Sequence, residues 1–263
     1  GWPEPRRDRV PVNIIVPVLD PARAADLVAA SGCRTAKVKV ADPGMELAAD
    51  LDRVAAVRRA LGPTGAIRID ANGAWTVAEA IPAIARLDEA AEGLEYVEQP
   101  CRTLAELAEL RLRVRPKIAA DESIRGAADP AAVRLADAAD VAIVKVAPLG
   151  GVRAALRIAQ GAGVPAVVSS AVDSAVGLTA GIALAAALPE LPYACGLGTG
   201  VLLADDVCGR PPRPVDGVLE VATRAPDPDR IDEVAADAEA TAYWRDRLRR
   251  VALITQALTQ GRT

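Results

Sequence analysis

Histidine is absent from this chain of 263 residues. Its absence excludes Ser/His/Asp and Cys/His catalysis, zinc sites that use histidine ligands, and acid/base chemistry by an imidazole. Any proton transfer must therefore use lysine, aspartate, glutamate or tyrosine.

Paired cysteines are also missing. The four cysteines lie far apart without a CxxC spacing, at Cys33, Cys101, Cys195 and Cys208. This spacing favours buried, reduced thiols over a disulfide framework or a zinc cluster.

The chain has little charge of either sign in excess, with a formal net charge of −4 and interspersed acids and bases. No basic stripe or polybasic cluster indicates nucleic acid or a membrane surface as a partner. The apolar stretch 164–188 is interrupted by Ser169, Ser170 and Asp173, so it does not predict a membrane span, and no signal peptide is recognisable. We expect a soluble, cytoplasmic protein.

Apolar segments of strand and helix length alternate along most of the chain. The pattern predicts strands at 12–16, 36–40, 66–70, 94–98, 117–121, 141–146, 165–169 and 193–197. It predicts helices between them at 21–30, 46–61, 76–87, 104–114, 130–137, 151–162 and 175–187.

This alternation predicts an α/β fold of the TIM type, a (β/α)8 or modified (β/α)7β barrel over residues 11–210. An open doubly wound sheet is the alternative, but no GxGxxG follows any expected strand. Residues 1–10 are interpreted as a linker or the remnant of a preceding domain. In the tail, 211–263, we expect a hairpin at 215–218 and a closing helix at 237–258 with Trp244 and Leu248 on its inner face.

Two lysines occupy the second expected strand. Lys37 and Lys39 are two residues apart, so both side chains lie on one face. A solvated edge strand that carries lysines against aggregation would explain the segment alone equally well.

The other expected strands also end in polar residues, and the carboxyl ends of barrel strands share one mouth. One such acid would more often be a helix cap, but three consecutive strands that end in acids and are flanked by lysines favour a functional site. The strand-end residues are Lys39, Asp70, Glu98, Asp121, Lys145 and Ser169, followed by the loop 196–200.

Three carboxylates in one site repel one another unless a cation neutralises them. Hard oxygen ligands without histidine or cysteine predict Mg²⁺, with Mn²⁺ as a substitute. A metal-bound substrate carboxylate would stabilise an enediolate when the α-carbon loses its proton. Lysine can accept that proton if burial and a nearby cation lower its pKa from about 10.4 towards roughly 7 to 8.

These residues resemble the enolase superfamily, muconate-lactonizing subgroup. The resemblance is carried by the Lys37/Lys39 pair, Asp70-Ala71-Asn72, Glu98-Gln99-Pro100, Asp121-Glu122-Ser123 and Lys145 before Gly150-Gly151. Within the subgroup, Val12-Asn13, the segment 169–174 and the segment 191–197 are most similar to the o-succinylbenzoate synthases of actinobacterial type, enzymes of menaquinone biosynthesis.

The resemblance implies a role for each matching position. Asp70, Glu98 and Asp121 would be the Mg²⁺ ligands, Lys39 the acid/base, Lys145 the cation that stabilises the enediolate, and Lys37 the residue that tunes Lys39. The implied reaction is the dehydration of a cyclohexadiene carboxylate to an aromatic product. Candidate substrate contacts are Asn72, Ser169, Gly196, Gly198 and Thr199.

Several alternatives remain open. The family places an α+β capping domain before its barrel, and we expect that domain to be missing here, with turnover impaired more than metal binding. A racemase of N-acylamino acids or a dipeptide epimerase would use Lys39 and Lys145 as opposed bases. A non-catalytic barrel, a Schiff-base aldolase that uses Lys145, and a phosphate cradle at 196–200 are further alternatives. The oligomeric state, monomer or homodimer, is not predicted.

Overall fold

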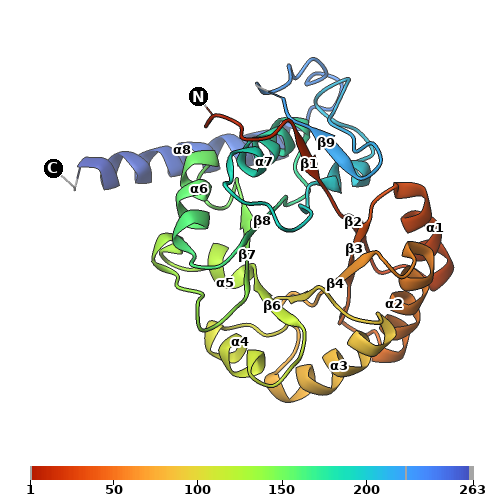
Figure 1. Ribbon diagram of the computed structural model, residues 1–263. Coiled ribbons are helices and arrows are strands. Elements are labelled where there is room, and N and C mark those ends of the chain that lie inside the picture. Colours follow the sequence, from red (N-terminus) through yellow and green to blue (C-terminus); the bar gives the residue numbers. More distant parts are fainter. Residues whose placement is uncertain (1, 223, 261–263) are drawn as a thin grey trace.

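A curled parallel sheet organises the molecule, seen in the computed structural model of residues 2–222 and 224–260 (Figure 1). Its seven strands are hydrogen-bonded in sequence order, and all neighbouring pairs are parallel. The strands are β2 (Ile14–Val16), β3 (Thr35–Lys39), β4 (Ala66–Asp70), β5 (Tyr96–Glu98), β6 (Lys117–Ala120), β7 (Val141–Lys145) and β8 (Ala166–Ser169). Connecting helices lie on the outside of this ring (Figure 1), as expected for right-handed crossovers of a barrel.

The ring closes through two residues of the eighth expected strand. Gly196 bridges Ser169 of β8, and Cys195 bridges Val12 just before β2. The N–H of Cys195 donates to the carbonyl of Pro11 at 2.7 Å, and the N–H of Gly196 donates to the carbonyl of Val168 at 2.8 Å. The segment expected as a strand at 193–197 is therefore reduced to isolated bridges, but these bridges join both edges of the sheet and exclude an open doubly wound arrangement.

Three helices begin at a residue whose side chain caps the first turn. Asp20 caps α1 by accepting from the N–H of Arg23, and Thr76 and Thr103 form capping boxes with Glu79 and Glu106 at α3 and α4. The helices of the barrel are α1 (Pro21–Ser31), α2 (Leu47–Leu61), α3 (Val77–Ala90), α4 (Leu104–Arg111), α5 (Glu122–Arg125), α6 (Val152–Gly161) and α7 (Ala175–Ala187).

The expected turn at 216–217 is present. Asp216 and Gly217 both have positive φ, and Val215 and Val218 form an antiparallel bridge across them. The following strand β9 (Val218–Glu220) pairs with β1 (Arg9–Pro11) as a separate two-stranded ribbon. Gly217 packs against Cys33, where a Cβ would lie 2.9 Å from the Cys33 Cα.

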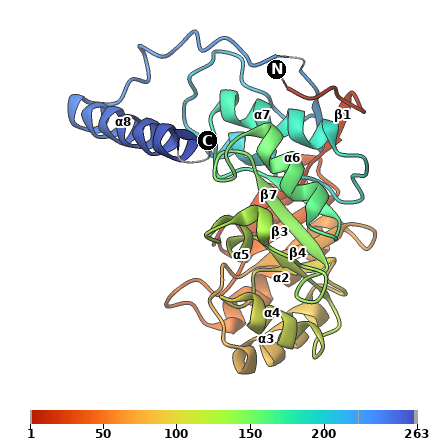
Figure 2. The same cartoon turned by 90° about the vertical axis from the view of Figure 1, so that its left-hand side faces the viewer.

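Two helical predictions were wrong. The expected helix at 130–137 is only a 3₁₀ turn, η1 (Pro130–Ala132), because the backbone becomes extended at Val133 with a ψ of 129°, and Leu135 is buried in the core from this non-helical segment. The C-terminal helix α8 (Ala238–Gln260) forms, but its Trp244 and Leu248 are 60% and 69% exposed. Helix α8 therefore has no buried inner face at these residues and lies outside the strand ring (Figures 1 and 2).

The four cysteines are buried and free, as predicted. In the part of the chain that the structure describes, no helix has the length and apolarity needed to cross a bilayer.

Candidate active site

The strand ends bring the predicted lysines and acids together. Lys39 lies in register with Asp70, and Asp70 in register with Glu98, across β3, β4 and β5. Asp121 directly follows β6, and Lys145 ends β7. Three acids from consecutive strands are thus flanked on each side by a strand that ends in lysine.

Lys37 is buried between two of these acids. Its Nζ lies 2.8 Å and 2.9 Å from the two carboxylate oxygens of Glu98 and 3.2 Å from Oδ2 of Asp70. All three side chains are almost inaccessible, with 6% of Lys37 and 1% of each acid exposed. This burial excludes the solvated-edge interpretation of the lysine pair.

Burial and charge shift the pKa values of this trio in different directions. Burial raises the pKa of Glu98 to about 7, and the nearby carboxylate of Asp70 adds to this effect while Lys37 opposes it. Burial would also raise the pKa of Asp70, but Lys37 and Lys39 outweigh it and hold that pKa below its ordinary value. Burial lowers the pKa of Lys37, but Glu98 and Asp70 outweigh it and keep that pKa above its ordinary range. Lys37 is therefore a permanent cation here.

Lys39 shares the acid with Lys37 but reaches further towards solvent. Its Nζ lies 2.6 Å from Oδ2 of Asp70, and one third of its side chain is exposed. It also donates to Oδ1 of Asn72 at 2.8 Å. Asn72 is the residue that follows Ala71 after β4, and its φ of 47° turns the chain at the mouth.

A second charged group lies at the end of β6 and β7. Lys145 Nζ lies 2.6 Å from Oδ2 of Asp121, and Arg125 Nε lies 3.1 Å from the other oxygen. The side chain of Gln99 accepts from the N–H of Asp121 at 2.9 Å and from that of Ser123 at 3.2 Å. Gln99 thus fixes the backbone that carries Asp121.

Sequence reasoning missed the residues that connect the two groups. Glu122 Oε1 accepts from Arg125 at 2.6 Å and from Asn72 Nδ2 at 3.2 Å, so contacts continue from Asp121 to Lys39. Glu122 is part of the Asp121-Glu122-Ser123 motif, so the motif could have identified Glu122 as a site residue. Arg125 lies one turn further along α5, a helix that the apolar pattern did not predict.

The expected substrate contacts fall into two groups. Ser169 lies in register with Lys145, and its Oγ approaches the carbonyl of Gly196 at 3.4 Å, so Ser169 lies between the lysine and Gly196. Thr199 is buried and its hydroxyl is paired with that of Ser170, in the 3₁₀ turn η2 (Gly198–Leu202). At Gly198 a Cβ would lie 2.9 Å from the carbonyl oxygen of Asn13. Gly198 and Thr199 are therefore packed against neighbouring segments.

The donor chemistry of the cluster fits a hard cation. All three predicted ligands are carboxylates, and the adjacent Glu122 has a buried oxygen, Oε2, without a hydrogen-bond partner. Within residues 2–222 and 224–260, however, no three acids or cysteines lie close enough as they stand to share one metal ion. Asp70 and Asp121 face Lys39 and Lys145 instead, so the lysines now supply the compensating charge.

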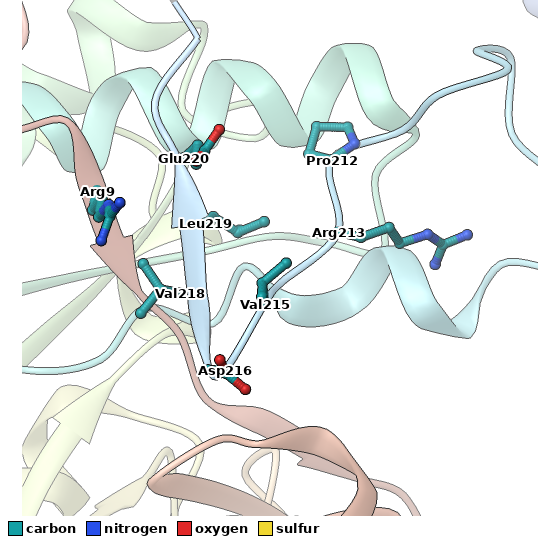
Figure 3. Close-up of a pocket in the computed structure, with 8 residues that line it drawn as sticks. All are labelled: Arg9, Pro212, Arg213, Val215, Asp216, Val218, Leu219 and Glu220. Atoms are coloured by element: carbon teal, nitrogen blue, oxygen red, sulfur yellow. The ribbon is translucent and has the colours of Figure 1, made fainter.

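A separate pocket of about 510 Å³ lies at the β1–β9 ribbon (Figure 3). Its lining includes Arg9, Arg213, Asp216 and Glu220. Asp216 packs beside Gly32, which precedes β3, so this end of the pocket lies towards the amino ends of the strands. The pocket contains none of the predicted catalytic residues.

Comparison with known proteins identifies the superfamily to which the chain belongs. The family model described as "Enolase C-terminal domain-like" matches residues 20–226. The muconate lactonizing enzyme of Pseudomonas putida superposes with a TM-score of 0.70 at 26% identity, over 85% of this chain and 63% of that one. The L-Ala-D/L-Glu epimerase of Bacillus subtilis superposes with a TM-score of 0.72 at 25% identity, over 86% of this chain and 66% of that one. The chain belongs to the enolase superfamily and carries its C-terminal barrel domain.

Two curated relatives indicate one particular activity within this superfamily. The o-succinylbenzoate synthase of Thermobifida fusca is 60% identical over 248 residues, which cover 94% of this chain and 77% of the relative. The o-succinylbenzoate synthase of Mycobacterium tuberculosis (strain ATCC 25618 / H37Rv) is 57% identical over 249 residues, covering 94% and 74%. This similarity supports o-succinylbenzoate synthase, a hydro-lyase, as the activity of the chain.

Proposed function

We propose that this protein converts 2-succinyl-6-hydroxy-2,4-cyclohexadiene-1-carboxylate to o-succinylbenzoate by a Mg²⁺-dependent syn-dehydration, a step of menaquinone biosynthesis. The observation that carries this proposal is the flanking of three strand-end acids by two lysines, each in contact with an acid at 2.6 Å. The identity of 57% and 60% to two o-succinylbenzoate synthases supports the substrate.

Lys39 is the acid/base of this proposal. Its position on the rim, one third exposed, allows a neutral amine to reach the α-proton of a bound carboxylate. The ammonium so formed then donates the same proton to the departing hydroxide, so one water leaves and the ring becomes aromatic. One group on one face of the substrate accounts for the syn geometry.

Lys145 is the cation that stabilises the negative charge of the enediolate in this proposal. It lies on β7, across the three acids from Lys39, and 12% of its side chain is exposed. A cation fixed beforehand next to developing charge stabilises it without reorganisation. Lys37 holds the side chains of Asp70 and Glu98 in place through its hydrogen bonds to both.

Asp70, Glu98 and Asp121 would hold Mg²⁺, or Mn²⁺ as a substitute. The bound ion would supply a Lewis acid for the substrate carboxylate and a positive charge beside Lys39. Ser169, in register with Lys145, and its neighbour Gly196 are proposed to contact the succinyl arm, with Asn72 at the opposite rim. Gly198 and Thr199 pack behind these residues, against Asn13 and Ser170. The partner is thus a small carboxylate, with neither nucleic acid nor a membrane involved.

The test is an assay of o-succinylbenzoate formation with Mg²⁺, with EDTA, and with the Lys39→Ala variant. We expect product only when Mg²⁺ is present, and we expect the Lys39→Ala variant to be slower than wild type by about 10²- to 10⁴-fold. Turnover in EDTA, or turnover by Lys39→Ala at the wild-type rate, would contradict the proposal.

A second candidate function is the epimerisation of N-acylamino acids or dipeptides. It is favoured by two lysines on opposite sides of the acids and by the similarity to the Bacillus epimerase. A two-base epimerase exchanges the α-hydrogen of an amino-acid substrate with solvent, so N-acylamino acids incubated in D₂O would gain deuterium. We expect dehydration to be faster than this exchange.

A further inference from the structure

A buried ion pair on α2 lies behind the end of β3. Asp50 and Arg53 are each 1% exposed, and their side chains form a salt bridge one turn apart on the helix. Such a pair loses much of its electrostatic gain to desolvation, so it contributes little to stability unless it fixes a geometry.

Both residues bind the backbone around Lys39. Arg53 Nη2 donates to the carbonyl oxygen of Lys39 at 3.0 Å, and Nη1 donates to that of Leu19 at 3.3 Å. Asp50 Oδ2 accepts from the N–H of Ala41 at 2.8 Å. The carbonyl of Lys39 and the N–H two residues later are therefore held by opposite charges from one helix.

The backbone between these two contacts is strained. Ala41 has a φ of 59°, a conformation that residues with a Cβ rarely adopt and that persists only where the surroundings impose it. The hydrogen bond from the N–H of Ala41 to Asp50 is one of the contacts that hold this conformation. The strain lies two residues from Lys39, so its release would move the end of β3.

We propose that Arg53 and Asp50 are positioning residues for Lys39. They fix the backbone from which its Nζ reaches the reacting carbon. This inference rests on the proposed function, because it assigns Lys39 the role of acid/base. The pair acts through main-chain atoms and touches neither Asp70, Glu98 nor Asp121 directly, so its effect is on proton transfer and not on metal binding.

Arginine is required because one planar guanidinium reaches two carbonyls and a carboxylate together. Lysine at this position keeps the charge beside Asp50 but offers no fixed fork. We therefore expect the Arg53→Lys variant to recover part of the activity lost in the Arg53→Met variant.

The same helix supplies a matched control. Arg58 is also buried on α2, 6% exposed, and donates to the carbonyls of Ala91, Gly62 and Gly65 at 2.7, 2.6 and 2.9 Å. Gly65 precedes β4, so Arg58 holds backbone at the end of the barrel opposite the mouth. Arg58→Met and Arg58→Lys therefore remove comparable contacts far from Lys39.

The experiment measures kcat, KM and Mg²⁺ affinity of the purified variants at a temperature where each is folded by circular dichroism. We expect Arg53→Met to lower kcat about tenfold to a hundredfold, because a displacement of about 1 Å has an effect of this size. KM and the Mg²⁺ dissociation constant should stay within about twofold, and Arg58→Met should keep kcat within about twofold. A substrate deuterated at the α-carbon should show a larger isotope effect on kcat with Arg53→Met than with wild type.

Equal kcat in the Arg53 and Arg58 variants would overturn the inference, as would a loss expressed only in KM. If Arg53→Met does not fold, Arg53→Lys and Asp50→Asn replace it. If none of these three variants folds while the Arg58 variants do, Asp50 and Arg53 serve only to stabilise the fold, and the inference is also overturned. The Lys39→Ala assay separates the two proposals, because an active Lys39→Ala variant refutes the proposed function itself.

Discussion

Lys37 donates to both carboxylate oxygens of Glu98 inside the barrel, at 2.8 Å and 2.9 Å, with almost no solvent access to either side chain. The contact places a fixed cation beneath the acids proposed to bind metal. The pKa of Glu98 is raised because its side chain is buried beside other charged groups. Its position at the end of a strand does not by itself cause this shift.

Removal of this cation should destabilise the fold. Lys37→Met leaves Glu98 and Asp70 without their buried partner, and loss of one member of such a pair costs about 3–5 kcal/mol. Urea unfolding in EDTA measures the loss, which saturating Mg²⁺ should reduce. Lys117→Met is the control, because Lys117 is exposed and its amino group donates to the Tyr193 hydroxyl and not to a buried acid. An unfolding free energy of Lys37→Met within about 1 kcal/mol of wild type in EDTA would contradict the buried pairing.

Mg²⁺ should stabilise the native protein. At a concentration of 100 times its dissociation constant, a ligand specific for the native state adds about 2.7 kcal/mol. Thermal unfolding with Mg²⁺ and with EDTA checks this. Glu98→Gln should abolish the rise in Tm, whereas Asp137→Asn, at an exposed carboxylate, should retain it. A full rise in Tm for Glu98→Gln would remove Glu98 from the ligand set.

Lys145 and Arg125 both hold Asp121, and their variants should separate catalysis from positioning. Lys145→Met should lower kcat by about 10²- to 10³-fold even at saturating Mg²⁺, because it removes charge stabilisation from the reacting centre. Arg125→Met should weaken Mg²⁺ binding and recover when Mg²⁺ is raised. Steady-state kinetics over a Mg²⁺ titration measures both. If the kcat of Lys145→Met recovered at high Mg²⁺, Lys145 would act only by holding Asp121 in place.

Gly196 should tolerate no side chain while Ser169 is present. A Cβ at Gly196 would lie 2.5 Å from Ser169 Oγ and 3.1 Å from its Cβ. Gly196→Ala should cost about 1–3 kcal/mol of stability, as overpacking does. Ser169→Ala in the same chain should restore part of it by removing the nearer atom. A double-mutant cycle by urea unfolding measures this coupling, and strictly additive losses would exclude the contact.

Helix α8 should contribute little to stability at its exposed apolar positions. Trp244→Ser and Leu248→Ser should each change the free energy of unfolding by less than about 0.5 kcal/mol. Leu107→Ala, at a fully buried position, should cost about 2–5 kcal/mol. Chemical unfolding provides the comparison. A loss above 2 kcal/mol for Leu248→Ser would mean that α8 packs in solution.

The site was predictable because its residues end strands of one repeating unit. Once Lys39, Asp70 and Glu98 were recognised as successive strand ends, the barrel topology alone placed them side by side, as the register confirms. Their roles as ligands or bases stay predictions.

Other features depend on packing that no local pattern records. Asp50 and Arg53 have the spacing of a solvated salt bridge on a helix, and only the fold buries them. Trp244 and Leu248 have the spacing of an inner face, but packing against the described chain does not bury them. The helix expected at 130–137 also depends on packing, because the backbone becomes extended at Val133 and buries Leu135 from a non-helical conformation.

The bridges of Cys195 and Gly196 set the order in which the barrel can be completed. Cys195 bridges Val12, more than 180 residues earlier, and Gly196 bridges Ser169, so the ring cannot close until both residues have been synthesised. Until then, β2 and β8 are both unpaired sheet edges able to recruit another chain. Formation of these two bridges, each a single residue pair, is therefore the step that removes both exposed sheet edges.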